Sequence, residues 1–186
     1  MRKLKKKLKI MHIILSKGFA GSEKYVVDLT CHQYENNQVY VIILKQNKEL
    51  KNSLEKKLKI YEIGRFLKKY NIQKIINKIK PQIVHTHLGE AAKLVQKSKE
   101  FKTVATMHMN YKYKDYKNSD AIIVSNNTQY REIRKKYFGK LFKSYLWVKL
   151  PKPEINKKNL RKNLNLPKKN FIFGSIGRFH PQKGFD

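Results

Sequence analysis

The sequence contains a single cysteine, Cys31, among its 186 residues. One thiol excludes a disulfide scaffold and any zinc site built from cysteines alone. Long hydrophobic runs are also missing, since no stretch approaches the roughly 20 apolar residues of a membrane span. The run after the basic residues 1–9 has about six apolar residues and contains His12, whereas a secretory signal needs roughly 7–15. We therefore expect a cytoplasmic protein, and peripheral attachment to the inner face of the cytoplasmic membrane stays open.

Acidic residues are scarce, because 13 Asp and Glu stand against 43 Lys and Arg, which gives a formal net charge of +30. Arginine is scarce too, with 6 residues against 37 lysines. Nucleic-acid binding favours clustered arginines, whose guanidinium groups make bidentate contacts, whereas these lysines are spread along the chain. Lys, Asn and Ile share A/T-rich codons, so genome bias can supply much of the surplus. We expect no nucleic-acid partner; an anionic membrane surface stays a candidate, since it requires charge without fixed geometry.

Hydrophobic residues make up 40% of the chain, enough to bury a core, and short apolar runs alternate with longer periodic segments. This alternation is typical of βα units and a parallel sheet. The clearest helix covers residues 66–80, where isoleucines recur at i, i+3, i+4 and i+7 before Pro81. We expect strands at 10–15, 39–44, 60–63, 82–87, 103–107, 121–125 and 171–176, and further helices at 22–34 (capped by Ser22), 90–99 and 126–138. The predicted fold class is α/β, a Rossmann-like parallel sheet flanked by helices.

The composition changes near residues 148–169, where three prolines interrupt a segment rich in Lys and Asn. We expect residues 1–150 to form one domain, residues 151–169 a linker, and residues 170–186 the start of a second domain. The chain stops ten residues after the last expected strand, and a lone strand cannot satisfy both of its edges. The second domain is therefore expected to be incomplete.

Histidines mark the expected carboxyl ends of two strands. His85 and His87 lie two residues apart and so point to the same side of a strand. His87 ends that strand, Glu90 follows it, and His108 ends the next strand. Ligands of such sheets bind outside the carboxyl ends, so we expect His87 and His108 to contact a ligand and His85 to be structural. Glu90 is expected, with His87, to contact the acceptor or the sugar. Neither an H-E-x-x-H motif nor a cysteine accompanies them, so we expect no metal.

Two further segments can approach an anion. The loop before the first helix ends at Gly21, where backbone N–H groups and the positive helix end can face a phosphate, although spacing alone fits a plain tight turn equally well. After the last expected strand, Gly177 precedes Arg178 and Lys183, two cations suited to a diphosphate. Because arginine is scarce in this chain, Arg178 is the stronger candidate of the two.

Five motifs together resemble one enzyme family. They are Ala20-Gly21-Ser22-Glu23, Ile83-Val84-His85-Thr86-His87, Thr106-Met107-His108, Ile122-Ile123-Val124-Ser125 and Gly177-Arg178-x4-Lys183-Gly184. Their order and spacing across nearly the whole chain resemble the family 4 glycosyltransferases of GT-B fold. The resemblance implies two Rossmann-like domains and transfer of a sugar, with retention, from a nucleotide-sugar to a surface glycan or glycolipid acceptor. It implies no cofactor and no metal, with the nucleotide-sugar as co-substrate.

The same resemblance implies roles for single residues. His108 matches the cleft histidine that contacts the transferred sugar, and Gly21 matches the glycine loop near the donor diphosphate. Arg178 and Lys183 match the pair that neutralises the leaving diphosphate. The chain departs from the family in having Ala20 for the first glycine of the loop. It also lacks the Glu-x7-Glu motif, and residues 150–153 replace the usual Asn-Gly.

The resemblance implies that residues 1–150 are the acceptor-side domain of a glycosyltransferase, and the chain alone is expected to be inactive because one wall of the cleft is missing. Two other hypotheses stay open. One is a non-catalytic lysine-rich module that binds an anionic membrane or nucleic acid, which would gather its charge on one face. The other is an unrelated Rossmann-like nucleotide-binding enzyme, which the absence of G-x-G-x-x-G after the first strand disfavours.

Overall fold

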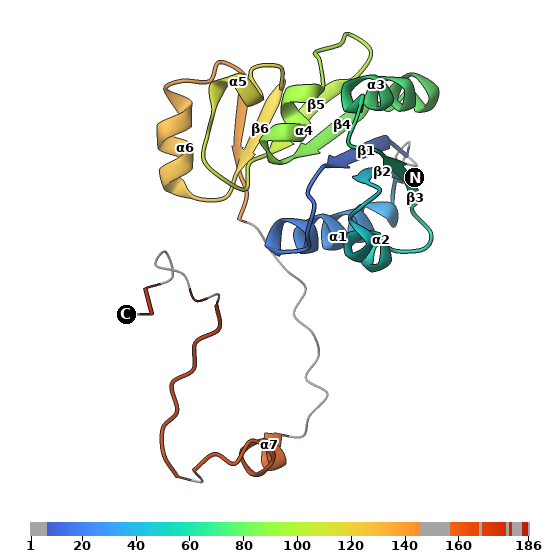
Figure 1. The fold of residues 1–186 in the computed structure, drawn as a ribbon. Coiled ribbons are helices and arrows are strands. Elements are labelled where there is room, and N and C mark those ends of the chain that lie inside the picture. The colour runs from blue at the N-terminus through green and yellow to red at the C-terminus, as the bar shows by residue number, and fades with distance from the viewer. Residues whose placement is uncertain (1–6, 146–156, 168, 178, 180–183, 186) are drawn as a thin grey trace, which may run out of the picture. The chain divides into compact units, whose positions relative to one another are not determined.

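The computed structural model describes residues 7–145, 157–167, 169–177, 179 and 184–185. The chain divides into two units, Met1–Lys149 and Leu150–Asp186. The described part of the first unit is a parallel sheet of seven strands flanked by helices (Figure 1). The fold class predicted from the sequence is therefore confirmed as Rossmann-like α/β.

The strands of the sheet follow the expected apolar runs closely. They are β1 (Lys9–Ile14), β2 (Gln38–Leu44), β3 (Lys59–Ile63), β4 (Ile83–His87), β5 (Lys102–Thr106), β6 (Ala121–Val124) and β7 (Lys140–Lys143). The helices are α1 (Gly21–Tyr34), α2 (Lys48–Ser53), α3 (Lys68–Ile79), α4 (Leu88–Leu94), α5 (Tyr113–Tyr116), α6 (Asn127–Arg134) and, in the second unit, α7 (Lys157–Asn163).

The order of the strands places a switch point at the centre of the sheet. Across the sheet the order is β3-β2-β1-β4-β5-β6-β7, and every neighbouring pair is parallel. The chain builds outward from β1 to β3, returns to lay β4 beside β1, and then builds outward in the other direction. In open α/β sheets, ligands bind outside the carboxyl ends of the strands at this reversal. The carboxyl ends of β1 and β4 therefore define the expected ligand edge.

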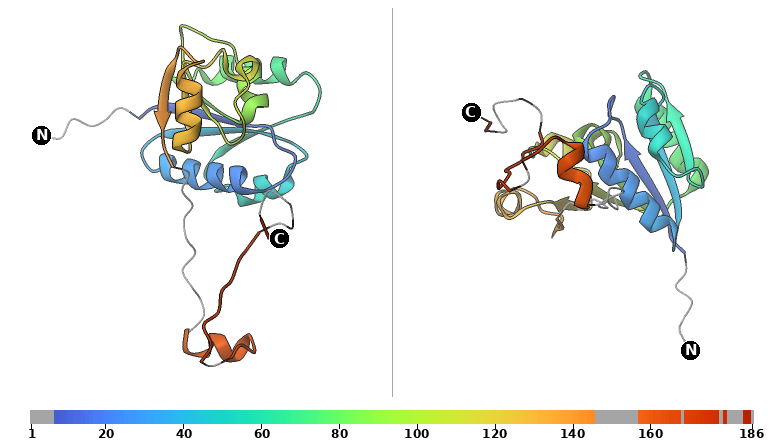
Figure 2. Two further views of the ribbon diagram at one scale, coloured as in Figure 1. Left: turned by 90° about the vertical axis from the view of Figure 1, so that its left-hand side faces the viewer. Right: turned by 90° about the horizontal axis from the view of Figure 1, so that it is seen from below.

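Two hydrophobic clusters cover opposite faces of the sheet beside the switch point. On one face, Met11 and Ile13 of β1 pack with Ile72 and Ile76 of α3. On the other face, Ile14 of β1 packs with residues of α1 and α2 (Figure 2). The expected helix with its isoleucine stripe is thus confirmed, although it begins at Lys68 rather than at residue 66. Alternation along β1 puts His12 on the same face as Ile14, beneath α1.

Several local predictions were wrong. The N-cap of α1 is Ala20 rather than Ser22, because the Glu23 carboxylate accepts the hydrogen bond of the Ala20 N–H. Helix α4 ends at Leu94, since the next residue, Val95, is extended and buried in the core. Helix α6 ends at Arg134, and Tyr137 beyond it donates its hydroxyl hydrogen to the Ser119 carbonyl at 2.6 Å.

Three elements of the first unit were missed: α2, α5 and β7. Strand β7 is short, with lysines at both of its ends, while α5 has four residues and α2 has six, so none of them produces a periodic signal long enough to detect. Charged residues on a short strand are typical of a sheet edge, where they discourage pairing with another chain.

The second unit contains α7 and an extended segment. The Arg161 guanidinium donates hydrogen bonds to the carbonyls of Pro167 and Asn170. The strand predicted at residues 171–176 does not form: Phe171, Phe173 and Ile176 are exposed by 83%, 90% and 104%. A strand forms only where a neighbour accepts and donates its backbone hydrogen bonds, and no described residue pairs with this segment.

Candidate functional site

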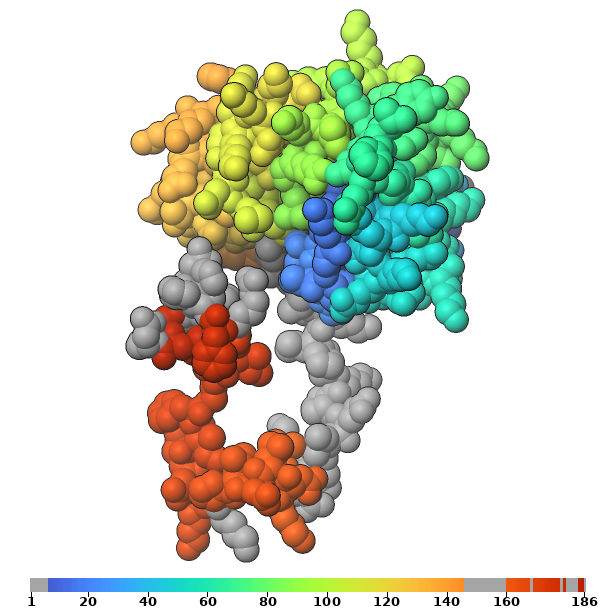
Figure 3. All heavy atoms as spheres, viewed as in Figure 1, coloured from blue at the N-terminus to red at the C-terminus, as the bar shows by residue number. Residues whose placement is uncertain are grey.

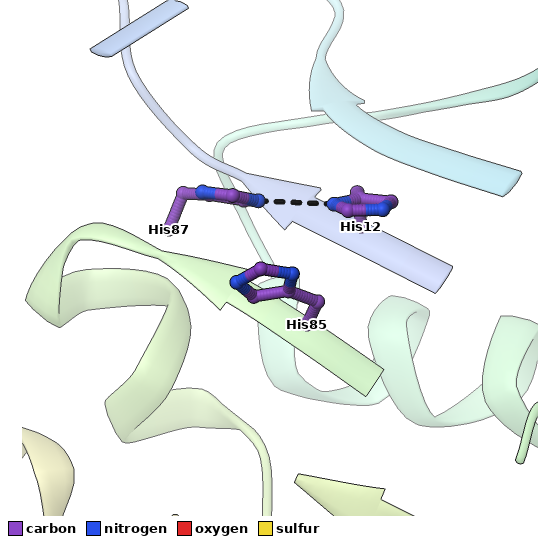
Figure 4. A group of neighbouring side chains, drawn as sticks. All are labelled: His12, His85 and His87. Carbon is purple, nitrogen blue, oxygen red and sulfur yellow. Dashed lines mark hydrogen bonds between the residues drawn. The ribbon is translucent and has the colours of Figure 1, made fainter. Parts of the chain in front are cut away.

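Histidines from three neighbouring strands meet on the face of the sheet that α1 covers. His12 lies on β1, His85 and His87 lie on β4, and His108 follows β5 (Figure 4 shows the first three). Parallel pairing sets His12 directly opposite His85 and Ile14 opposite His87. His12, His85 and His87 are buried, and His108 is half-buried. The four rings therefore form a polar patch inside an otherwise aliphatic face, and His108 is the member that reaches the surface.

A chain of hydrogen bonds links three of these rings to a side chain of α1. His12 Nδ1 lies 3.0 Å from His87 Nε2, and His12 Nε2 lies 2.7 Å from Gln33 Oε1. At the other end, His87 Nδ1 lies 3.4 Å from His108 Nε2. His85 is outside this chain. We refer to Gln33, His12, His87 and His108 as the histidine chain.

Burial keeps these imidazoles neutral. Desolvation lowers the pKa of His12 to about 4, against a weaker opposing effect of the hydrogen bond to Gln33. Desolvation, followed by repulsion from the neighbouring histidines, lowers the pKa of His85 and of His87 well below the ordinary value. Desolvation also lowers the pKa of His108 to about 4, although the Glu23 carboxylate pulls it upward. At neutral pH each ring therefore carries one N–H donor and one acceptor nitrogen.

The first turns of α1 form one wall of the site. Tyr25 sets its ring edge-on to His108, with ring centroids 5.4 Å apart. Glu23 is buried, and its carboxylate accepts from the Ala20 N–H at 2.7 Å and from the Ser22 hydroxyl at 3.0 Å. This carboxylate already holds a donor at the start of the helix and places negative charge there. The expected diphosphate role of Gly21 stays a prediction; a Cβ at Gly21 would meet no atom within 4 Å, so open space surrounds it.

The remaining predicted site residues are not part of the histidine chain. Glu90 lies in the first turn of α4 and forms an ion pair with Lys68 of α3. Arg178 and Lys183 lie outside the described residues. The structure therefore brings His87 and His108 together, as expected at adjacent carboxyl ends. It buries His87 completely and leaves His108 half-buried, so of these two rings only His108 is accessible to a ligand.

Sequence analysis missed two members of the histidine chain. His12 stands in the middle of an apolar strand, on the same face as Ile14. This position is the sequence signal that its side chain is buried. Gln33 lies in the last turn of α1 and carries no local signal at all. Leu88, directly after His87, adopts a φ of +68°, which is strained for a branched side chain. Such strain gathers at functional sites, and it is consistent with a role for this turn.

His12, His85 and His87 are also the one described group with three metal-ligating atoms close together, within 4.8 Å of one another. Zinc is bound by imidazole nitrogens that converge on one point. Here the His12 and His87 nitrogens bond to each other, and His85 Nε2 is taken by Thr106 Oγ1 at 2.7 Å. The rings of His85 and His87 stack at 4.4 Å, so their in-plane lone pairs run side by side. The trio fits a hydrogen-bonded network, and a metal would require the rings to turn.

Two hollows bracket the sheet. One of about 150 Å³ lies at the carboxyl end of β5 and is lined by Met107, by the loop that follows it and by α6, including Tyr111 and Gln129. The Tyr111 hydroxyl is buried there without a hydrogen-bond partner among the described residues. A larger hollow of about 470 Å³ lies at the amino ends of the strands, between Lys7, Tyr34 and Lys59. By size, the larger hollow is the better candidate for a ligand site. The usual position of ligands in such sheets and the cluster of titratable histidines favour the carboxyl edge instead.

Within the described part of the chain, no helix has both the length and the apolar character needed to cross a membrane. Long side chains project from the helices into solvent, as Figure 3 shows for α3 in green. Lysines on different elements contribute to this surface, among them Lys51 of α2, Lys74 of α3 and Lys135 after α6.

Comparison with solved structures identifies chains of the same fold. The chain superposes on the HepE protein (Alr3699) of Anabaena, crystallised in complex with UDP and glucose, with a TM-score of 0.69 and 13% identity. A second crystal structure of HepE, in complex with UDP-glucose, gives a TM-score of 0.68 and 14% identity. Each alignment covers 96% of this chain and 55% of HepE, so this chain spans about half the length of that protein. At this identity the likeness shows a shared fold.

A scan against protein families finds no match, and a search of curated proteins finds none either.

Proposed function

We propose that residues 1–150 are the acceptor-side domain of a retaining glycosyltransferase of GT-B fold. A nucleotide-sugar would be the donor, and a surface glycan or lipid-linked sugar the acceptor. The observation that carries this proposal is the polar cluster around His108 at the carboxyl edge of the switch point. The fold is shared with a protein crystallised with UDP-glucose and also with UDP and glucose, the two parts into which that donor divides. This combination supports sugar transfer better than a dinucleotide-dependent reaction.

The described residues suggest a division of labour. His108 is half-buried and neutral, so it can hydrogen-bond a sugar hydroxyl without attracting an anion. Glu90 is exposed at the same edge and is available to an acceptor once its ion pair with Lys68 opens. Arg178 and Lys183 would neutralise the diphosphate as the bond from the anomeric carbon to its oxygen breaks and negative charge accumulates there. No metal or cofactor enters this scheme.

A titration followed by amide chemical shifts tests the proposal with the whole chain. UDP-glucose, UDP and glucose are added separately to millimolar concentration. We expect glucose and UDP-glucose to shift the backbone amides of Gly21, Glu23 and His108. His108→Ala should weaken that binding about fivefold, the worth of one hydrogen bond. His32→Ala is the matched control, because His32 is exposed on α1.

Shifts confined to the hollow around Lys7 and Lys59, or no shifts at all, would contradict the assignment of this edge.

The lysine surplus supplies a second test, because an anionic membrane is the partner that unclustered charge favours. Binding to phosphatidylserine vesicles should weaken steeply as salt rises, since exposed charges are screened beyond about 10 Å at 0.1 M. Tight, salt-resistant binding to a defined RNA or DNA would instead favour the nucleic-acid module.

A further inference from the structure

The histidine chain has a direction, and Gln33 determines it. An amide oxygen only accepts hydrogen bonds, so the Gln33 Oε1 at 2.7 Å requires the hydrogen of His12 to be on Nε2. A neutral imidazole has one N–H, so His12 Nδ1 carries a lone pair and accepts from His87 Nε2–H at 3.0 Å. His87 Nδ1 is then the acceptor in turn, and it receives the Nε2–H of His108 at 3.4 Å.

We propose that Gln33, through His12 and His87, fixes His108 as its Nε2–H tautomer and leaves His108 Nδ1 as a hydrogen-bond acceptor for a hydroxyl group of the ligand. His108 touches the ligand; Gln33, His12 and His87 are positioning residues. Nδ1 of His108 has no hydrogen-bond partner among the described residues. Gln33 reaches this network from α1, and His12 and His87 lie buried beneath that helix, where a ligand cannot reach them.

The direction of the chain decides which ligands His108 accepts. In the opposite direction, the Gln33 amide nitrogen would donate to His12, every ring would reverse, and His108 would present Nδ1–H. An N–H suits the unprotonated oxygens of a phosphate, which only accept hydrogen bonds, whereas a lone pair suits a hydroxyl and repels an anion. The direction that the Gln33 oxygen implies therefore selects a sugar or other polyol over a phosphate at this position. The tautomer part stands without the proposed function, and the sugar part rests on it.

Surrounding groups support this direction. Tyr25 packs edge-on against both His87 and His108, with centroid separations of 6.1 and 5.4 Å, and so holds the two rings in place. His85 stacks on His87 at 4.4 Å but bonds Thr106, so it competes for neither nitrogen of His87. Because the pKa values of these rings are low, none of them takes up a second proton at neutral pH, and each keeps one donor and one acceptor nitrogen.

Nitrogen-15 NMR of the histidine rings in the full chain tests the tautomers directly. The chain has six histidines, so single substitutions assign each ring. In the wild type we expect unprotonated Nδ1 and protonated Nε2 for His12, His87 and His108 at pH 7.5. Protonated Nδ1 on His108 would overturn the proposal, and the tautomers themselves are read in the wild-type chain.

Variants of Gln33 test the cause. Gln33→Leu removes the acceptor and should turn the single tautomer of His12 and His108 into a mixture, whereas Gln33→Glu supplies an obligate acceptor and should preserve it. Gln73→Leu, the same change on the exposed face of α3, is the control and should alter neither ring. An unchanged single tautomer in Gln33→Leu would refute the role of Gln33.

The ligand part is tested in the same spectra. Glucose at millimolar concentration should shift the His108 Nδ1 resonance, and inorganic phosphate at equal concentration should leave it in place. A response to phosphate alone would overturn the assignment of a hydroxyl ligand. No response to either, with Nδ1 unprotonated, would count against the proposed function and not against the tautomer.

Discussion

His85 Nε2 lies 2.7 Å from Oγ1 of Thr106, so a buried imidazole of β4 is held by a hydroxyl at the end of the neighbouring strand β5. Both side chains are buried, at 5% and 1% exposure. The same hydroxyl also bonds the side chain of Tyr25, which forms the wall beside His108. Thr106 therefore connects a structural histidine of the sheet to the helix that covers the site.

Replacing this hydroxyl should destabilise the fold. Thr106→Val keeps the shape but leaves a polar atom of His85 buried without a partner, which costs about 1–3 kcal/mol. Thr86→Val is a matched control, because the Thr86 hydroxyl makes a longer bond of 3.3 Å to the Val104 carbonyl. Urea unfolding of both variants at pH 7.5 measures the difference. Equal losses would show that His85 does not depend on Thr106.

Acid should destabilise the protein over a defined range. The folded pKa of His12 is about 4, below the ordinary 6.5 of the unfolded chain, so between these values the unfolded state binds more protons. Stability is therefore unaffected above pH 6.5 and falls as the pH drops toward 4, by about 3 kcal/mol from His12 alone. His85, His87 and His108 act in the same direction.

Free energies of unfolding measured at pH 7.5, 6.0 and 5.0 test how steeply the stability falls as the pH drops. His12→Asn should flatten this dependence on pH, because one buried titrating group is gone. His32→Asn is the matched control, since His32 is exposed on α1 and lies 3.7 Å from the Glu35 carboxylate. A stability that stays level between pH 7.5 and 5.0 would contradict the burial of neutral histidines.

Zinc should not stabilise the protein. Both ring nitrogens of His12 and of His87 are already engaged, with each other, with Gln33 or with His108, and His85 Nε2 is engaged with Thr106. Binding of zinc would forfeit these bonds and require the stacked rings to turn. We expect the midpoint of thermal unfolding to stay unchanged with one equivalent of zinc. A rise that disappears in His12→Asn and persists in His32→Asn would instead establish a metal site, by the linkage between binding and stability.

The ligand edge illustrates how far the sequence leads. His87 and His108 each follow an apolar run, and the carboxyl ends of parallel strands share one edge, so their proximity was predictable. The burial of His87 was not, because it depends on how α1 lies across the sheet. Helices α4 and α6 were predicted too long, since Val95 and Tyr137 leave the helical path for partners far away in the sequence.

By itself, the sequence determined the α/β class and the positions of six of the strands, because each buried strand must be an apolar run and each covering helix an amphipathic one. Only the tertiary structure decided which polar side chains meet. His12 and His87 are 75 residues apart, and Gln33 enters from a helix, so no local pattern records their contact. Their hydrogen bonds exist because strand order sets β1 beside β4 and α1 covers both. The direction of those bonds, and with it the chemistry we propose for His108, belongs to the fold.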